Sequence, residues 1–474
     1  MTSRDPRAPR VVVLVADGAR AHTLASAVAA GHLPAIARLR DGGAMRRVTT
    51  VFPSVTGPAY TPFLMGRYPG ALGLPGIRWY DRARSATAAP HFSRSYVGPE
   101  MAKVDADLDR AAYTMFELSK TSLGALSVIS RGLPPSQRIG RSVPFALRAA
   151  WTHFRGDVNG WLAIDERIGA QFATRLAKER PAFGFCALTG IDKTSHASGQ
   201  PSPASLGAMQ VVDRLVARIR DDAERDGTWE NTHLWIVSDH GHSPVAQHDD
   251  LAVAMRAEGV KVRAHPFVLG AGHRVAVMVS GNAMAHVYVD IAARERRPWP
   301  ELAAQWQWLA DWLLERPSVD LLILPLGDKQ CEIRARKRGG ARIVRERGRW
   351  AYRPESGDPL GIGPVDGLDS DDAWDATIRS DYPDALVQAL SLAASPRAGD
   401  LIVSAARSWD FRAKWEPIPH VSSHGALHRD HMLVPLVLGK VPSRAPRRTV
   451  DVMPSALTAL GRPIPDGLDG VSFV

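Results

Sequence analysis

The chain has 474 residues, 45% of them hydrophobic, which predicts a large core in one big domain with an insertion, or in two domains, and excludes a mainly disordered chain. Two cysteines exclude a disulfide framework. The net charge of +10, from 59 Lys and Arg against 49 Asp and Glu, favours phosphate-bearing molecules, but the basic residues are scattered, so we expect no nucleic-acid partner.

The N-terminal segment carries no targeting signal that we can identify. Residues 1–7 lack the apolar core of a secretory signal, and no stretch of the chain approaches about 18 uninterrupted apolar residues. We therefore expect a soluble, cytoplasmic protein without a transmembrane segment.

In chain order, short apolar runs alternate with helical patterns. The runs end at polar or charged residues, as buried strands of a parallel sheet do. The predicted strands are residues 11–16, 183–188, 234–237 and 435–438, and the predicted helices are residues 21–40, 206–223 and 451–460. This alternation predicts an α/β fold with a mainly parallel sheet between helical layers, in which ligands bind beyond the carboxyl ends of the strands.

Two stretches fit the sheet pattern poorly. Residues 84–155 have a helix-like composition, most clearly between residues 106 and 130. Residues 292–420 combine a predicted helix at 302–314 with short strand-like runs such as 321–324 and 341–344. We interpret the first stretch as a helical insertion and the second as a cap-like insertion beside the sheet.

Carboxylate and imidazole side chains follow the predicted strands. The candidates are Asp17, Asp192, His196, Asp239, His240 and His424. Such oxygen and nitrogen donors are ligands that Zn²⁺ accepts. A single Asp-His pair is a weak signal, because an Asp at a strand end often caps a helix. Four such points at four strand ends together favour a metal site.

A hydroxyl residue, Thr56, precedes Gly57-Pro58, and the helix predicted for residues 61–65 follows. Helix N-termini favour anions, so we expect a phosphoryl group to bind favourably near Thr56. On this segment alone an ordinary N-cap is the favoured explanation of the threonine. A threonine hydroxyl becomes a competent nucleophile only when a base or a metal helps to ionise it.

Taken together, these motifs resemble the nucleotide pyrophosphatase/phosphodiesterase branch of the alkaline-phosphatase superfamily. The resemblance rests on their order along the chain and on the C-terminal pattern. The matching segments are Asp17, Phe52 to Pro58 running into Gly66-Arg67-Tyr68-Pro69, Asp192-x-x-x-His196, Ser238-Asp239-His240-Gly241, Ser423-His424-Gly425, Asp451-x-x-Pro454 and Pro463 to Gly470.

The resemblance implies an alkaline-phosphatase-like fold and a zinc-dependent hydrolase of phosphate esters, with a small phosphate ester as substrate. It implies that one zinc is held by Asp192, His196 and His424. It implies that the other zinc is held by Asp17, Asp239 and His240, with the oxygen of Thr56. Two such ions would stabilise the attacking and leaving oxygens while Thr56 forms a phospho-threonine, which a metal-activated water then cleaves.

The chain departs from this branch in two places. Ala59-Tyr60 stand where those relatives have Asn-His, and Gly76-Ile77-Arg78 where a second Asn is expected. We expect Arg78 to replace that Asn as a substrate-binding residue, because a guanidinium suits a more anionic phosphoryl group. Sulfatase relatives have a Cys or Ser followed by x-Pro-x-Arg, which is absent here, so the sequence argues against a formylglycine-dependent sulfatase.

Several alternatives stay open. A phosphomonoesterase or a phosphoryl-transfer enzyme on the same fold is favoured if Arg78 binds a dianion. A metal-binding protein without turnover, or a lipid-surface protein that uses the helical segment near residues 106 to 150, is a different class. The further polar side chains near the motifs are left out of the ligand set: Lys193, His242, His248, His428 and His431.

Overall fold

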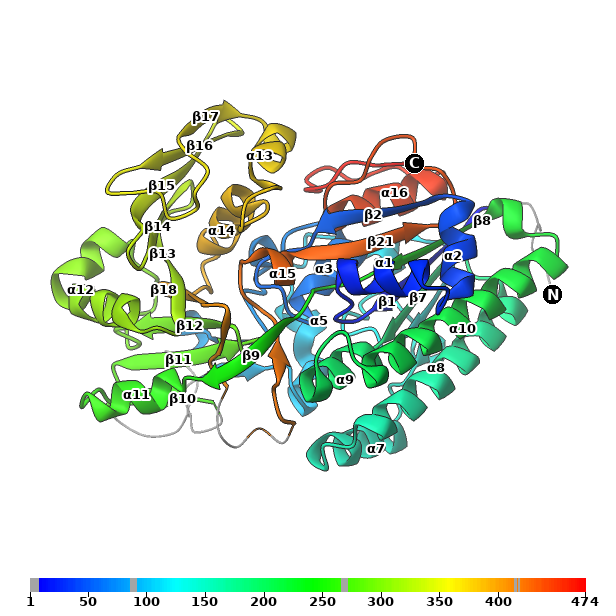
Figure 1. The fold of residues 1–474 in the computed structure, drawn as a ribbon, viewed down its shortest axis with the longest axis horizontal. Coiled ribbons are helices and arrows are strands. Elements are labelled where there is room, and N and C mark those ends of the chain that lie inside the picture. Colours follow the sequence, from blue (N-terminus) through cyan, green and yellow to red (C-terminus); the bar gives the residue numbers. More distant parts are fainter. Residues whose placement is uncertain (1–7, 86–91, 266–271, 413–415, 417) are drawn as a thin grey trace.

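The computed structural model describes residues 8–85, 92–265, 272–412, 416 and 418–474. At its centre lies a seven-stranded sheet in the order β2-β21-β8-β1-β7-β5-β6 (Figure 1). Its strands are β1 (Arg10–Ala16), β2 (Ala44–Thr49), β5 (Ser122–Ala125), β6 (Arg138–Ile139), β7 (Phe183–Leu188), β8 (Thr232–Val237) and β21 (Leu433–Leu438). Strands β8, β1, β7, β5 and β6 are parallel, whereas β21 and β2 are antiparallel additions.

Helices cover both faces of this sheet. Every residue of β1 is buried, and its apolar side chains alternate between the two faces, so both faces need a helical layer. Val12 and Leu14 pack with α1, α2, α8 and α10, and Val11 and Val13 pack with α3 and α16. These helices are α1 (Ala21–Ala29), α2 (Pro34–Asp41), α3 (Thr61–Met65), α8 (Val158–Glu179), α10 (Pro203–Arg225) and α16 (Val452–Ala459). The prediction of a mainly parallel sheet between helical layers is confirmed.

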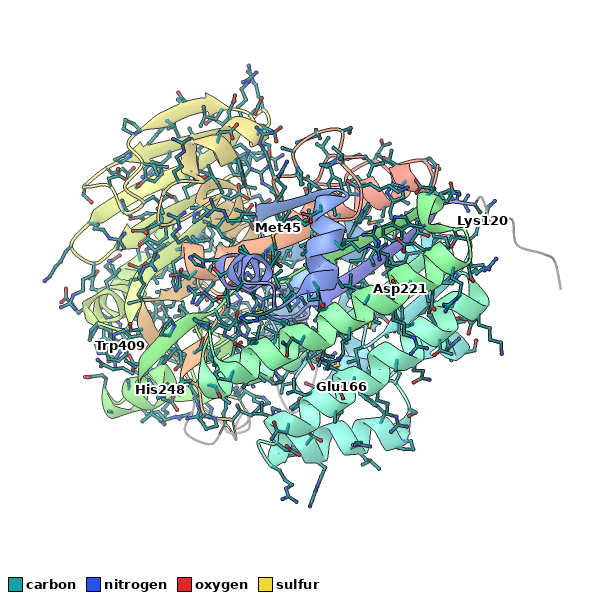
Figure 2. The ribbon with its side chains drawn as sticks, turned by 45° about the vertical axis from the view of Figure 1, so that its right-hand side comes forward. Met45, Lys120, Glu166, Asp221, His248 and Trp409 are labelled. Atoms are coloured by element: carbon teal, nitrogen blue, oxygen red, sulfur yellow. The ribbon has the colours of Figure 1, made fainter. Side chains whose placement is uncertain are left out.

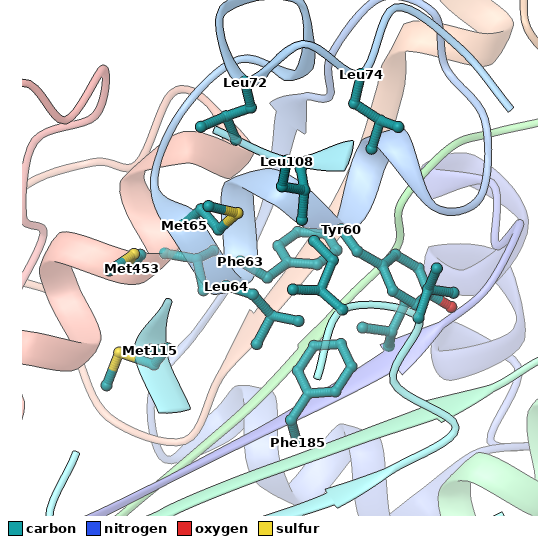
Figure 3. Close-up of a cluster of buried hydrophobic side chains, with 14 of the residues drawn as sticks. Tyr60, Phe63, Leu64, Met65, Leu72, Leu74, Leu108, Met115, Phe185 and Met453 are labelled. Carbon is teal, nitrogen blue, oxygen red and sulfur yellow. The ribbon is translucent and has the colours of Figure 1, made fainter. Parts of the chain in front are cut away.

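Figure 3 shows part of the α3 side of this core. The Tyr60 ring lies with its centroid 6.2 Å from that of Phe63 and 5.7 Å from that of Phe185. Met65 and Met453 bring α3 and α16 together. The chain that follows Thr56 is therefore fixed to the central sheet by apolar packing.

A second, nine-stranded sheet lies beside the first in the order β10-β11-β12-β18-β13-β14-β15-β16-β17 (Figure 1). Its strands are β10 (Val262–Ala264), β11 (Val275–Ser280), β12 (Met284–Val289), β13 (Val319–Gly327), β14 (Gln330–Ala335), β15 (Gly339–Glu346), β16 (Arg349–Pro354), β17 (Val365–Leu368) and β18 (Leu401–Ala405). All of its pairs except β10 with β11 are antiparallel. Helices α12 (Trp299–Glu315) and α14 (Ala385–Ala393) pack against it.

The remaining elements are mostly short, and α7 is the longest of them. The helices are α4 (Arg82–Ser85), α5 (Val104–Asp107), α6 (Met115–Leu118), α7 (Val143–Phe154), α9 (Gly190–Ser198), α11 (Leu251–Ala257), α13 (Ser370–Thr377) and α15 (Arg429–Met432). The strands are β3 (Arg78–Tyr80), β4 (Ser93–Ser95), β9 (Ser243–His248), β19 (Ser408–Asp410) and β20 (Ser422–Ser423). No helix among the described residues is long and apolar enough to span a membrane.

Two secondary-structure predictions are wrong. The single helix expected over residues 21–40 is broken into α1 and α2, because Gly31 has a positive φ of 78° and Pro34 opens the second helix. The helix-like segment expected over residues 84–155 contains strands β4, β5 and β6, and the last two extend the central sheet. Both strands are short, and β5 includes Gly124, so the strand pattern is weak.

The segment 292–420 holds the predicted helix, as α12, and strands at both predicted runs, as β13 and β15. The sheet to which they belong begins earlier in the chain, at β10. Whether residues 84–155 and 292–420 are insertions into a smaller catalytic domain stays a prediction.

Candidate metal centre

The carboxyl ends of neighbouring parallel strands bring the predicted site residues together. Asp17 follows β1 and Asp239 lies beyond β8, while Asp192 lies in the first turn of α9, just after β7. Because β8, β1 and β7 are adjacent and parallel, these three carboxylates meet at one edge of the sheet. His196 is four residues after Asp192 and so lies on the same side of α9.

Asp192 is the centre of a first group of four buried side chains. Its Oδ1 atom lies 3.0 Å from Nε2 of His242, 3.2 Å from Nε2 of His196 and 3.5 Å from Nε2 of His424. Oδ2 of Asp192 accepts a hydrogen bond of 2.8 Å from Nζ of Lys193. Three imidazole nitrogens therefore converge on one carboxylate oxygen.

Thr56 lies in a second group, with Asp17, Asp239 and His240. The Thr56 Oγ1 atom is 3.1 Å from Nε2 of His240 and 3.3 Å from Oδ1 of Asp17. Nε2 of His240 is also 3.4 Å from Oδ1 of Asp17 and 3.5 Å from Oδ2 of Asp239. The two groups are contiguous, because the rings of His240 and His424 stack with centroids 3.6 Å apart.

The ring nitrogens of these histidines have distinct roles. Nδ1 of His196, His240 and His424 lies 2.9, 3.1 and 3.0 Å from the carbonyl oxygens of Ser422, Gly241 and Ser54. A carbonyl can only accept, so each Nδ1 carries the proton and each Nε2 presents a lone pair. Backbone carbonyls fix metal-binding imidazoles in the same way.

This arrangement fits bound metal ions. Nε2 lone pairs and carboxylate oxygens face one another at 3.2 to 3.5 Å, and two acceptors at such a distance repel each other unless a cation or a proton lies between them. Oδ2 of Asp239 is buried and has no hydrogen-bond partner among the described residues. Burial, with Asp239 and Asp192 nearby, raises the pKa of Asp17 well above its usual value.

The geometry defines two sets of converging donors. One set contains Asp192, His196, His242 and His424, and the other contains Asp17, Asp192 and His240. Mixed imidazole and carboxylate donors suit zinc, and other divalent transition metals accept the same donors. The buried Asp and His side chains can therefore hold metal ions.

His242 is a member of the first set that the sequence-based ligand set omits. Its Nδ1 lies 3.2 Å from the hydroxyl oxygen of Ser422, which itself donates to the carbonyl of Ser243. That hydroxyl therefore accepts from Nδ1, and Nε2 of His242 presents a lone pair, as in the other three rings. Gly18 leaves room for this ring, since a Cβ there would lie 2.9 Å from Nε2.

Thr56 and Tyr60 are held on either side of Asp17. Thr56 is followed by Gly57, with a positive φ of 94°, and by the 3₁₀ turn Pro58–Tyr60 that leads into α3. The hydroxyl of Tyr60 donates to Oδ2 of Asp17 at 3.3 Å. Tyr60, which stands where the resemblance predicts a histidine, thus holds the Asp17 carboxylate in place by a hydrogen bond.

Arg78 is paired elsewhere in the structure. Its Nε donates to Oγ of Ser95 at 3.3 Å and its Nη1 to Oε1 of Glu416 at 3.4 Å. Glu416 also accepts 2.8 Å from the side-chain amide of Asn282, whose backbone forms a bridge with that of His424. Glu416 and Asn282 connect Arg78 to the metal centre, and direct contact of Arg78 with a substrate stays a prediction.

The other histidines near the motifs have structural contacts. His431 donates from Nε2 to Oγ of Ser243 at 2.8 Å and accepts from the amide of Ala426. His248 lies 2.6 Å from Oδ1 of Asp410. His428 stacks on His431, with ring centroids 3.9 Å apart. None of these three belongs to either donor set.

Solved structures share this architecture. Phosphonoacetate hydrolase from Sinorhizobium meliloti 1021, in complex with phosphonoformate, has a TM-score of 0.55 at 17% identity, with 96% of each chain covered. An inactive form of murine ectonucleotide pyrophosphatase/phosphodiesterase 5 in complex with AMP has a TM-score of 0.57 at 13% identity, with 97% of each chain covered. The likeness to these structures extends over nearly the whole chain and shows an alkaline-phosphatase-like fold.

Sequence comparison identifies the family. Residues 11–431 match the profile described as "Type I phosphodiesterase / nucleotide pyrophosphatase", and the chain belongs to that family. Human ectonucleotide pyrophosphatase/phosphodiesterase family member 1 is 25% identical over 236 residues, which are 49% of this chain and 23% of the relative. The mouse protein of the same name matches equally, over 24% of its length. The matched region is thus about a quarter of these curated relatives.

Proposed function

We propose that this chain is a metal-dependent hydrolase of phosphate esters, of the phosphodiesterase or nucleotide pyrophosphatase type, with Thr56 as its nucleophile. The observation that carries the proposal is the position of the Thr56 hydroxyl, 3.3 Å from a carboxylate oxygen of Asp17 and 3.1 Å from Nε2 of His240. A threonine needs such neighbours to become reactive.

The group around Asp192 and the group around Thr56 would each hold one divalent ion. Zinc is the first candidate for both. Asp192, His196 and His424 would hold one ion, with His242 as an additional nitrogen donor. Asp17, Asp239 and His240 would hold the other, next to Thr56. When bound, such ions neutralise charge on the phosphate and lower the pKa of a coordinated hydroxyl or water.

The chain's own groups account for the bond changes. Oγ1 of Thr56 attacks phosphorus and forms a new P–O bond, and its proton passes to the neighbouring carboxylate of Asp17. The bond to the leaving alcohol or phosphate breaks, and that group departs with the electron pair and takes the proton from Asp17. Water then attacks phosphorus, the bond to Oγ1 breaks, and Thr56 regains its hydrogen. The net reaction is hydrolysis.

Two considerations support a diester or pyrophosphate over a monoester. The family is that of type I phosphodiesterases and nucleotide pyrophosphatases. The monoester alternative depends on Arg78 binding a dianion, whereas Arg78 is paired with Glu416. The cytoplasmic location expected from the sequence stays a prediction.

Replacement of the nucleophile tests this proposal. Thr56→Ala removes the attacking oxygen, so we expect the turnover of bis-p-nitrophenyl phosphate to fall by about a thousandfold or more, with the bound-metal content unchanged. Thr56→Ser keeps a hydroxyl and is the matched control, for which we expect a smaller loss. Hydrolysis by Thr56→Ala at a rate near that of the wild type would rule out the threonine nucleophile.

A further inference from the structure

Helix α7 turns a row of large apolar side chains outward. Val143, Leu147, Trp151 and Phe154 are 74%, 68%, 65% and 74% exposed. Their spacing of four, four and three residues places them on one side of the helix. The opposite side is buried at Thr152, whose Cγ2 atom lies close to Gly160 of α8. We call these four residues the outer face of α7.

This exposure is concentrated and not scattered. The described residues include fourteen exposed large hydrophobic side chains, and four of them belong to this helix of 12 residues. In Figures 1 and 2, which differ by a 45° rotation, α7 lies at the lower edge of the molecule with no other element beyond it. Contiguous apolar surface of this kind marks a site of interaction.

The surroundings of the outer face are basic. Residues 131–156 contain five arginines and neither Asp nor Glu. Arg148 and Arg155 are exposed, and at about 100° per residue they fall beside Trp151, at the margin of the outer face. The Arg155 guanidinium carbon lies 5.4 Å from the centroid of the Trp151 ring. The apolar row is therefore bordered by positive charge without a neighbouring carboxylate on the helix.

Helix α7 and the start of α8 also adjoin the metal centre. Nζ of Lys193, the residue next to Asp192, lies 6.0 Å from the centroid of the Trp161 ring on α8. Burial, together with the positive charges of Lys193 and Arg78, lowers the pKa of His153 on α7 to about 4. Surface contact through α7 would thus bring the metal centre near whatever α7 touches.

We propose that the outer face of α7 docks onto an anionic phospholipid surface. Trp151, Phe154 and Leu147 enter the boundary between headgroups and acyl chains, while Arg148 and Arg155 face the lipid phosphates. Interfacial helices combine these same side-chain types, and each basic residue near such a surface adds attraction to anionic lipid. This docking does not depend on the hydrolase function proposed above.

A second copy of this chain is a less suitable occupant. In a two-fold contact through α7, each outer face would meet its own copy. The arginine margins of the two copies would then approach each other with no acidic residue on either helix to balance them. An anionic lipid surface supplies the missing negative charge.

Vesicle sedimentation with the full chain tests the proposal. We expect binding to vesicles of phosphatidylcholine with phosphatidylserine, weaker binding to phosphatidylcholine alone, and loss of binding as salt is raised. Trp151→Ser should weaken partitioning to the anionic vesicles about tenfold, and Leu147→Ser combined with Trp151→Ser still further. Trp308→Ser, which removes another exposed tryptophan on α12, is the matched control and should bind as the wild type does.

Turnover of the soluble substrate bis-p-nitrophenyl phosphate reports on folding and keeps the two proposals separate. We expect it unchanged in the α7 variants, and we expect Thr56→Ala to bind vesicles normally. Absence of vesicle binding by the wild type overturns the docking proposal, whatever the outcome for hydrolysis. It is also overturned if the wild type is a dimer in solution that Trp151→Ser converts to monomers, because α7 is then an interface between copies.

Discussion

At the scale of single residues, the metal centre is prepared by hydrogen bonds to the backbone. Carbonyls of Ser422, Gly241 and Ser54 each fix the proton of one histidine on Nδ1. The rings are thereby held with Nε2 directed at the carboxylates, so little reorganisation is needed when ions bind.

His242 provides the first residue-scale prediction. His242→Ala removes one of three nitrogens that face Asp192, so we expect affinity for zinc to fall by about 10- to 100-fold. Titration of the metal-free protein against a zinc-chelator buffer measures this change independently of activity. His32→Ala removes an exposed histidine and serves as control. Wild-type affinity in His242→Ala would exclude His242 as a ligand.

The sequence could predict which residues gather but not every member of the group. Asp17, Asp192 and Asp239 were predictable, because each follows an apolar strand and parallel strands end at a common edge. His242 was not, since it approaches Asp192 after the chain has turned at Gly241 into β9. A signal existed in the pattern Asp239-His240-Gly241-His242, where a second imidazole follows two residues after the first.

At the scale of elements, a buried ion cluster ties α5 to β4 and α4. Asp107 accepts hydrogen bonds of 2.7 Å from Nε of Arg94, 2.5 Å from Nη1 of Arg84 and 2.9 Å from the hydroxyl of Tyr96. Burial acts to raise the pKa of Asp107, but these donors outweigh it and the pKa lies below its usual value. The cluster holds together the segment between β3 and β5, in which the helices and strands are short.

Replacing this carboxylate should have a pH-dependent effect. Asp107→Asn leaves buried Arg94 with the partly exposed Glu100 as its remaining anion, and we expect a loss of about 3 kcal/mol of stability at neutral pH. Because the pKa is lowered on folding, the contribution is present above about pH 4 and disappears as pH falls through the folded-state value. Denaturant unfolding of both proteins from pH 7 downward measures the converging difference.

The control for this prediction is a nearby exposed carboxylate. Asp109 is half-exposed and lies 3.8 Å from Arg67, so Asp109→Asn should cost at most about 1 kcal/mol. A stability difference for Asp107→Asn that grows as pH falls would contradict the argument.

The sequence predicted the helices and strands that contain long apolar runs, and it missed short ones. Strands β1, β7 and β8 and helix α10 were predicted because long buried runs leave a clear period. Strand β5 was missed, because four residues with a glycine and a serine carry no such pattern. It becomes a strand through pairing with β7, a contact distant in sequence.

At the scale of the whole molecule, bound metal ions should stabilise the fold by joining segments that are far apart in the sequence. Ligands from residues 17 to 424 meet at one place, so a bound ion stabilises the folded state against the unfolded chain. We expect about 2.7 kcal/mol per site when free metal exceeds the dissociation constant a hundredfold. Thermal unfolding with a chelator and with added zinc should show a higher Tm with zinc.

Variants connect that shift to the site. Asp192 belongs to both donor sets, so Asp192→Asn should abolish most of the zinc-dependent rise in Tm. Asp41→Asn alters an exposed carboxylate and should keep the full rise. If zinc leaves the Tm of the wild type unchanged, the Asp and His cluster does not bind zinc in the folded protein.

The strand order of the central sheet has a consequence for biosynthesis. Strand β21, near the C-terminus, lies between β2 and β8, which are made far earlier. While a ribosome is still translating the middle of the chain, the facing edges of β2 and β8 remain unpaired and prone to wrong association. These edges pair correctly only once residues 433–438 have emerged, so the nascent polypeptide needs protection from aggregation until that point, by which time His424 is also present to complete the centre.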